Sequence, residues 1–300
     1  MNMANRTEEQ EATSVMFGFL DEIAPARRWV LVWPREHGAW GILLVSLFTG
    51  SAVGISSGSR MLPFLWLTIG VLSAFCLRTP MENSMPRSPF RPRTDAERRW
   101  VSLAGGVYTV IGAVAGVMLW LDGALQLVWM PAAAAIGLFG VQVLLKRLDR
   151  SLRLPAEIAG AFGLALAAAA GYIVCAGHGG ELAAGVWVAN ALFVANQILY
   201  VQFRMQEARG GAHASPKKLK QMFLASEVAM LLAIVGGTLR GMLPVLTLAA
   251  FLPVLVRGSA WTLRGGPTPL RIHRLGKSEL AQAIAFGLIF IAVSRVHWSL

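Results

Sequence analysis

The chain has 300 residues, of which 55% are apolar and 14% charged, and its formal net charge is +11. A soluble globular domain carries about 25% charged residues, so this composition excludes an ordinary soluble domain, and the high apolar content excludes intrinsic disorder. The two cysteines provide neither a disulfide framework nor a zinc-binding spacing. Residues 1–14 are polar and partly acidic, which is not the pattern of a secretory signal peptide.

The segment ahead of the first long apolar run, residues 1–33, is expected to be a cytoplasmic N-terminal segment. Trp29 and Trp33 lie close to Arg27 and Arg28 in it, and this combination is typical of the headgroup region of a membrane. The pattern predicts an amphipathic helix that anchors the chain to the membrane surface, with docking of a partner as the alternative. The apolar residues that recur at helical spacing are Val15, Met16, Phe19, Leu20 and Ile23.

Residues 34–300 are expected to form one transmembrane domain. A bilayer core about 30 Å thick requires roughly 20 apolar residues for each helical crossing. Because helices satisfy their own backbone groups in lipid, we predict an all-α polytopic membrane protein with nine transmembrane helices. The predicted spans are residues 37–56, 61–77, 101–121, 124–145, 156–176, 184–203, 221–239, 242–257 and 279–296. The eighth is short and contains Pro244 and Pro253.

The distribution of basic residues predicts the orientation of these spans. With the N-terminus in the cytoplasm and nine crossings, every lysine and arginine except Arg60, Arg240 and Arg295 falls on the cytoplasmic side. This agrees with the positive-inside rule. We therefore expect a multi-pass protein of the cell inner membrane with its C-terminus outside. The basic charge is then explained by topology and anionic lipid, and no nucleic-acid partner is expected.

Polar residues within the spans are the default indication of a functional site in a membrane protein. Asn190, Gln197 and Arg204 recur at a spacing of seven in the sixth span, so they form a stripe along one helix face, with Tyr200 beside it. Glu227 in the seventh span lies in the same half of the membrane. The stripe predicts a polar cavity open to the cytoplasm. Hydrogen bonding between helices is the alternative explanation for any single Asn or Gln.

The run Pro34–Trp40 at the start of the first span reads PREHGAW and is the strongest local motif. Arg35, Glu36 and His37 provide a fixed cation, an acid and a group that titrates near neutral pH. A simple interfacial anchor would need only Arg35 and Trp40. The combination therefore predicts that Glu36 and His37 handle protons and that Arg35 and Trp40 contact a ligand.

The PREHGAW run, followed directly by a Leu- and Val-rich span, resembles the signature of the YwiC-like family of bacterial membrane proteins. The general layout of the chain agrees with that family over most of its length. The resemblance implies a membrane protein but no particular chemistry. Residues 34–40 are therefore the only ones that it marks as family residues.

Nine helices with longer cytoplasmic loops after the second and sixth spans also resemble, more distantly, the UbiA-type prenyltransferases. That resemblance implies a UbiA-like bundle and Asp-rich loop motifs that hold magnesium and a prenyl diphosphate. This chain departs from the pattern, because Arg78 and Arg204 stand in the two loop regions where carboxylates would be needed. Arginines there would instead bind an anionic headgroup directly, since guanidinium matches phosphate.

Our functional prediction is a membrane protein that binds an isoprenoid, quinone-like or anionic lipid ligand. Arg78, Arg204 and Arg274 would hold the head of the ligand, and the stripe would line its chamber. No metal site or cofactor is expected, and whether a transferase reaction follows binding stays open. The alternatives are a small-solute or ion transporter, favoured by the prolines of the eighth span, and a non-catalytic assembly factor.

Overall fold

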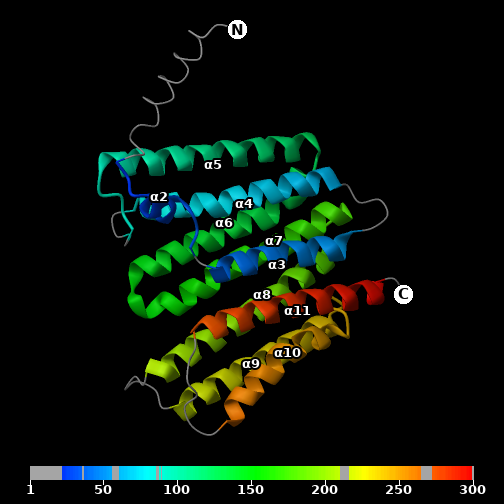
Figure 1. The fold of residues 1–300 in the computed structure, drawn as a ribbon. Coiled ribbons are helices and arrows are strands. Elements are labelled where there is room, and N and C mark those ends of the chain that lie inside the picture. Colours follow the sequence, from blue (N-terminus) through cyan, green and yellow to red (C-terminus); the bar gives the residue numbers. More distant parts are fainter. Residues whose placement is uncertain are drawn as a thin grey trace, which may run out of the picture. The chain divides into compact units, whose positions relative to one another are not determined.

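The computed structural model describes residues 22–35, 37–55, 61–85, 88, 90–209, 216–264 and 272–298 (Figure 1). In these residues all regular secondary structure is helical: ten α-helices and the short 3-10 helix η2 (Arg150–Leu152). The α-helices are α2 (Pro25–Val32), α3 (His37–Gly54), α4 (Met61–Asn83), α5 (Asp95–Leu121), α6 (Leu125–Leu148), α7 (Arg153–Ala176), α8 (Glu181–Arg209), α9 (Pro216–Leu239), α10 (Thr247–Leu263) and α11 (Ile272–Trp298).

Seven of the described helices, α4 to α9 and α11, are long and apolar enough to cross a membrane by length and composition. Two more, α3 and α10, are shorter apolar helices. Each predicted span coincides with one of these helices. The chain is therefore an all-helical protein with the apolar helices of a polytopic membrane protein. The predicted helix around Val15 to Leu20 lies outside the described residues.

The boundaries predicted for the eighth span, residues 242–257, are wrong. The helix α10 begins at Thr247 and continues to Leu263, with Pro253 inside it. Pro244 lies in the turn before the helix, where a fixed φ and a missing N–H do no harm. The shift places Arg257 within the helix, whereas the sequence assigned it to a cytoplasmic loop.

The chain divides into two compact units, which are described separately. The first comprises Met1–His37 and Trp66–Leu119, and the second comprises Gly38–Leu65 and Trp120–Leu300. The boundary that the sequence predicts at residue 33, between the N-terminal segment and the transmembrane domain, stays a prediction.

In the first unit, α2 packs beside α5, and α4 packs against α5. Leu31 and Val32 of α2 form a buried cluster with Val101 and Ala104 of α5. The Ser73 hydroxyl on α4 donates a hydrogen bond to the Tyr108 carbonyl on α5. Close packing there uses small residues, as membrane helices do in the absence of a hydrophobic drive between them.

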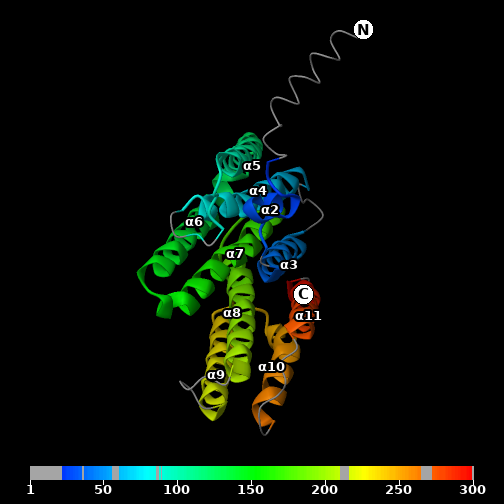
Figure 2. The same cartoon turned by 60° about the vertical axis from the view of Figure 1, so that its left-hand side comes forward.

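In the second unit, α7 is the most buried helix. It packs against α6 and α8, and α8 in turn contacts α9, α10 and α11 (Figure 2). Residues 165–175 of α7 are all buried and are rich in alanine. Because its side chains are small, neighbouring helices can approach α7 from several sides. This explains why the most apolar helix is also the most buried one in this unit.

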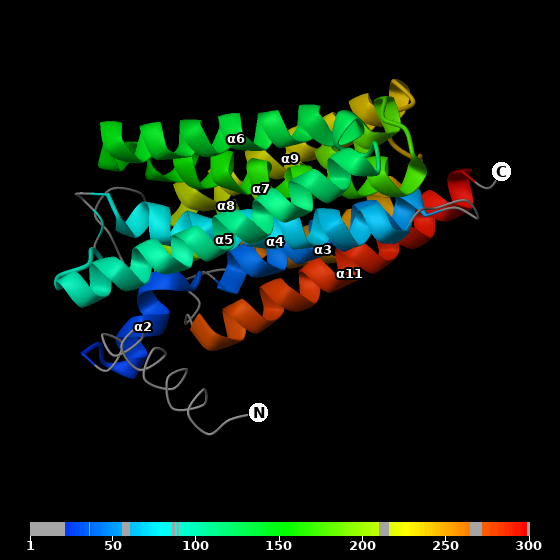
Figure 3. The same cartoon turned by 90° about the horizontal axis from the view of Figure 1, so that it is seen from above.

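The helix α3 crosses α7 at glycines and runs along α11 (Figure 3). A side chain at Gly50 would overlap the Ala168 carbonyl of α7, and one at Gly171 would meet the Leu47 carbonyl. On the other side, Gly287 of α11 lies next to Thr49. Glycine is required at Gly50 because the backbones touch.

We predict that Gly50→Ala destabilises the protein by about 1–3 kcal/mol, the usual cost of forcing an extra carbon into a packed interior. Gly140→Ala is the matched control, because a Cβ at Gly140 of α6 meets nothing within 4 Å. Thermal unfolding of both variants in detergent measures the difference. Equal melting temperatures for the two variants would contradict the close crossing of α3 and α7.

Candidate functional site

One face of α8 carries four buried polar residues, of which Tyr200 and Arg204 were predicted from the sequence. Asn196, Tyr200, Arg204 and Glu207 follow one another at spacings of three or four, so they lie along one side of the helix. All four are buried, with between 4% and 8% of their surface exposed. This side of α8 meets α9, α10 and α11.

Arg257 of α10 connects α8 to α11. Its guanidinium forms an ion pair of 2.5 Å with Glu279 Oε1 of α11 and donates a hydrogen bond of 3.3 Å to Asn196 Oδ1 of α8. The guanidinium carbon also lies 4.0 Å from the centre of the Tyr200 ring. A guanidinium stacked on an aromatic face and paired with a carboxylate retains its charge away from water. We call Asn196, Gln197, Tyr200, Arg257 and Glu279 the Arg257 network.

Gln197 attaches α8 to the first part of α11 by a second route. Its Nε2 donates a hydrogen bond of 2.8 Å to the backbone carbonyl of Glu279. The Glu279 residue is thus held by its carboxylate and by its carbonyl, from α10 and α8. Gln197 therefore joins α8 to α11, and its role in lining a chamber stays a prediction.

Glu207 forms a second charged group nearer the end of α8. Its Oε2 accepts hydrogen bonds from Arg204 Nη1 at 2.7 Å and from Trp261 Nε1 of α10 at 3.0 Å. The Lys220 ammonium of α9 lies 3.9 Å from Glu207 Oε1 and donates a hydrogen bond to the Arg264 carbonyl. Arg204 is therefore already paired with a carboxylate of its own helix.

Aromatic rings fill the space between the two charged groups. Tyr200, Phe203, Phe223 and Trp261 form a buried cluster with Leu219. The Tyr200 and Trp261 rings meet edge to face with centroids 5.6 Å apart. A second aromatic group lies on the other side of the Arg257 network, where Phe193, Phe251 and Phe286 of α8, α10 and α11 stack together. The polar residues are thus enclosed between apolar layers.

Glu227 of α9 faces the same region. It is 3% exposed, and a side chain at Gly258 of α10 would overlap its Oε1 and the Phe223 ring. The absence of a side chain at Gly258, next to Arg257, therefore makes room for the Glu227 carboxyl. An electrostatic interaction with Arg257 acts on this carboxyl.

Several buried polar atoms in this region have no hydrogen-bond partner among the described residues. They are Asn196 Nδ2, Glu207 Oε1, Glu227 Oε1, Arg257 Nε, Glu279 Oε2 and Gln282 Oε1. Buried polar atoms are nearly always paired, so an unpaired set from four neighbouring helices requires an explanation such as water, a proton or a ligand.

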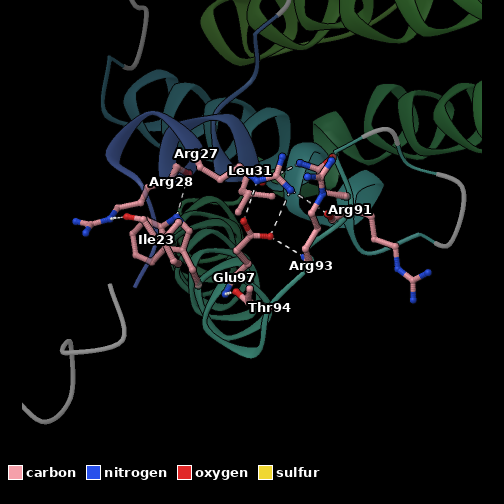
Figure 4. Close-up of polar contacts among 10 residues, drawn as sticks. Ile23, Arg27, Arg28, Leu31, Arg91, Arg93, Thr94 and Glu97 are labelled. Carbon is pink, nitrogen blue, oxygen red and sulfur yellow. Dashed lines mark hydrogen bonds and ion pairs between the residues drawn. The ribbon is translucent and has the colours of Figure 1, made fainter. Parts of the chain in front are cut away.

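In the first unit, Glu97 of α5 holds α2 in place (Figure 4). Its carboxylate forms an ion pair of 2.8 Å with Arg27 and accepts the Arg93 backbone N–H at 2.6 Å. The hydrogen bond that Arg27 donates to Glu97 raises the pKa of Arg27 above its ordinary value. Thr94 Oγ1 caps the start of α5 by accepting the Glu97 N–H. Trp29 of α2 and Trp33, which follows the helix, are exposed.

The described residues of the PREHGAW run differ in how exposed they are. Arg35 is exposed, and its guanidinium lies 5.3 Å from the centre of the Phe90 ring in the same unit. Trp40 is half-buried on α3. Glu36 and the side chain of His37 lie outside the described residues, so their proposed proton chemistry stays a prediction.

The remaining predicted ligand-binding residues do not join the Arg257 network. Arg78 belongs to the first unit and pairs with Glu82 at 2.9 Å. Arg274 is exposed on α11. Asn190 is buried, but its Nδ2 donates to the Val186 carbonyl of its own helix. The expected three-arginine grip on an anionic head therefore has no support in these contacts.

Sequence reasoning missed Arg257 and Glu207 as site residues. A signal for Arg257 existed, because a span that starts after Pro244 must continue past residue 257 to cross a bilayer core of about 30 Å. A signal for Glu207 was its position three residues after Arg204, which favours an ion pair.

The family comparison supports the resemblance over part of the chain. Residues 33–172 are similar to the YwiC-like family, because they match the family model described as YwiC-like protein. This YwiC-like segment starts one residue before the PREHGAW run, so the prediction made from that motif is confirmed. No curated protein and no solved structure matches the chain.

The Arg257 network lies beyond the YwiC-like segment, on α8, α10 and α11. The family therefore says nothing about its chemistry. The likeness to UbiA-type prenyltransferases stays a prediction. In the described residues, no three His, Cys, Asp or Glu side chains group as they would around a metal ion.

We predict that Glu207→Gln lowers the stability of the protein by about 3–5 kcal/mol, because it removes the carboxylate beside the buried Arg204 and the half-buried Lys220. The control is Asp95→Asn, which breaks an ion pair with Arg98 whose side chains are 84% and 61% exposed. An exposed pair contributes little to stability because water and salt screen it. Thermal unfolding of the two variants in detergent checks this, and a smaller loss for Glu207→Gln than for Asp95→Asn would contradict it.

Proposed function

We propose that the chain crosses the inner membrane nine times, with its N-terminus in the cytoplasm and its C-terminus outside. The support is the agreement between the nine predicted spans and helices α3 to α11, together with the sorting of basic residues. The helices α3 and α10 have 18 and 17 residues, which gives each a length at the lower limit for a crossing. They are the helices on which the count depends.

We further propose that the Arg257 network binds the polar head of a membrane lipid of the isoprenoid or quinone-like class. The observation that carries this proposal is the set of unpartnered buried polar atoms on α8, α10 and α11. A head with both carbonyl and hydroxyl oxygens would accept from Asn196 Nδ2 and Arg257 Nε and donate to Glu279 Oε2. Each new bond would remove the cost of a buried unpaired group.

The charge pairing favours an uncharged head over an anionic one. Arg204 is paired with Glu207, and Arg257 is paired with Glu279. An anionic head would have to compete with these carboxylates, and it would also approach the additional carboxyl of Glu227. Among the three ligand classes expected from the sequence, an anionic lipid is therefore the least suited to this network.

The arrangement of rings favours entry of the head from the side of the Glu207 group. The Phe193, Phe251 and Phe286 stack closes the other side with apolar surface. In the proposed orientation the Glu207 group faces the cytoplasm, because α8 runs from the outside inward. Whether the bound lipid undergoes a reaction is a separate question, and the network itself requires only binding.

Lipid binding is tested by adding decylubiquinone to the purified protein and measuring its affinity, with native mass spectrometry of the same sample to detect a co-purified isoprenoid. Asn196→Ala removes one unpartnered donor and should weaken decylubiquinone binding about tenfold, as expected for about 1.4 kcal/mol. Asn83→Ala is the matched control, since Asn83 is equally buried but bonds the Leu31 carbonyl in the first unit. Equal affinities in the two variants would refute the assignment of the site.

The nine-span topology is tested with alkaline phosphatase fusions, which are active only outside the cytoplasm. Nine crossings predict an inactive fusion at Asp149, after α6, and an active fusion at His178, after α7. If α3 and α10 did not cross, the seven remaining spans would reverse both results. A C-terminal fusion is active under either count, so it serves as the positive control.

A further inference from the structure

The Glu227 carboxyl is a buried group that neither the lipid-binding proposal nor the ion pairs use. It lies near the middle of α9, and both this carboxyl and the Phe223 ring lie against the Gly258 backbone of α10. Its Oε1 has no hydrogen-bond partner in the part of the chain that the structure describes. An ionised carboxylate in such surroundings is strongly disfavoured, whereas a protonated one is tolerated.

The charged and titratable groups around it are already engaged. On α8, Arg204 pairs with Glu207, and Tyr200 packs against Arg257. On α9 itself, Lys220 bonds the Arg264 carbonyl and lies near Glu207. On α10, Arg257 precedes Gly258, whose backbone lies beside the Glu227 carboxyl. Arg257 acts electrostatically on Glu227 and pairs with Glu279 of α11. The buried Glu227 carboxyl and the half-buried Glu279 carboxyl therefore compete for one guanidinium.

We propose that Glu227 is a proton-binding site that exchanges its proton as Arg257 changes partner. While Arg257 pairs with Glu279, Glu227 holds the proton and is neutral, and the guanidinium balances the negative charge of Glu279. When Arg257 turns to Glu227, the Glu227 O–H bond breaks and Glu279 takes up one proton. One proton moves for each exchange, so the buried charge is unchanged.

This exchange is a means of moving a proton between α9 and α11 inside the membrane. Glu279 lies seven residues after the start of α11, and Glu227 lies near the middle of α9. The proposal does not rest on lipid binding. It assigns the chain the elementary step that a proton-coupled membrane protein requires.

The test is infrared spectroscopy of the full-length protein in lipid nanodiscs at neutral pH. The wild type should show the carbonyl-stretch band of a protonated carboxylic acid, and the band should shift when glutamate is labelled with ¹³C. Glu227→Gln should abolish the band. Glu157→Gln, which changes a carboxylate of α7 paired with Arg153, should retain it.

The exchange itself makes a sharper prediction for Glu279→Gln. Arg257 then has no carboxylate on α11 and should pair with Glu227, so the band should disappear although Glu227 is intact. Retention of the band in Glu279→Gln would overturn the exchange, and retention in Glu227→Gln would overturn the site. If either variant fails to fold, absence of a ¹³C-sensitive band from the wild type alone overturns the proposal. Decylubiquinone binding measured on the same samples separates these outcomes from failure of the lipid site.

Discussion

The position of α8, α10 and α11 relative to one another depends on the charge of Arg257. A guanidinium remains charged under all ordinary conditions, so a buried one must be surrounded by groups that compensate it. Here the compensation comes from two other helices: the Glu279 carboxylate of α11, and the Asn196 amide and Tyr200 ring of α8. Removal of Glu279 would take away the carboxylate that balances this charge between the helices. This constraint explains how the short α10 is held although it contains Pro253.

The two charged groups in this region differ in which polar atoms they leave unpaired. Glu207 Oε2 accepts from Arg204 and Trp261, while Glu207 Oε1 has Lys220 nearby but no hydrogen-bond partner among the described residues. The Arg257 network leaves both donors and acceptors without partners there, namely Asn196 Nδ2, Arg257 Nε and Glu279 Oε2. A head that carries both carbonyl and hydroxyl oxygens can use that combination, which favours the Arg257 end as the binding site.

The YwiC-like segment and the Arg257 network are different parts of the chain. The segment, residues 33–172, includes α3 to α6 and most of α7, which supply the glycine crossing and the packing of α4 on α5. The Arg35 of the signature stacks on Phe90, a contact that ties the motif to the loop before α5. In the described residues the segment thus contributes helix packing. The buried charges that suggest chemistry are concentrated after it.

The sequence by itself determined the helical class, the approximate spans and the inward face of α8. Hydropathy and helical spacing are local properties, so long apolar runs and the positions of Gln197, Tyr200 and Arg204 could be read directly. What only the tertiary structure decided is which charges meet. Arg257 and Glu279 are separated by 22 residues, and Asn196 is 61 residues from Arg257, so no local pattern relates them. Their pairing arises from helix packing. The packing also pairs Arg78 and Arg204 with carboxylates of their own helices, and it leaves Glu227 Oε1 without a hydrogen-bond partner among the described residues.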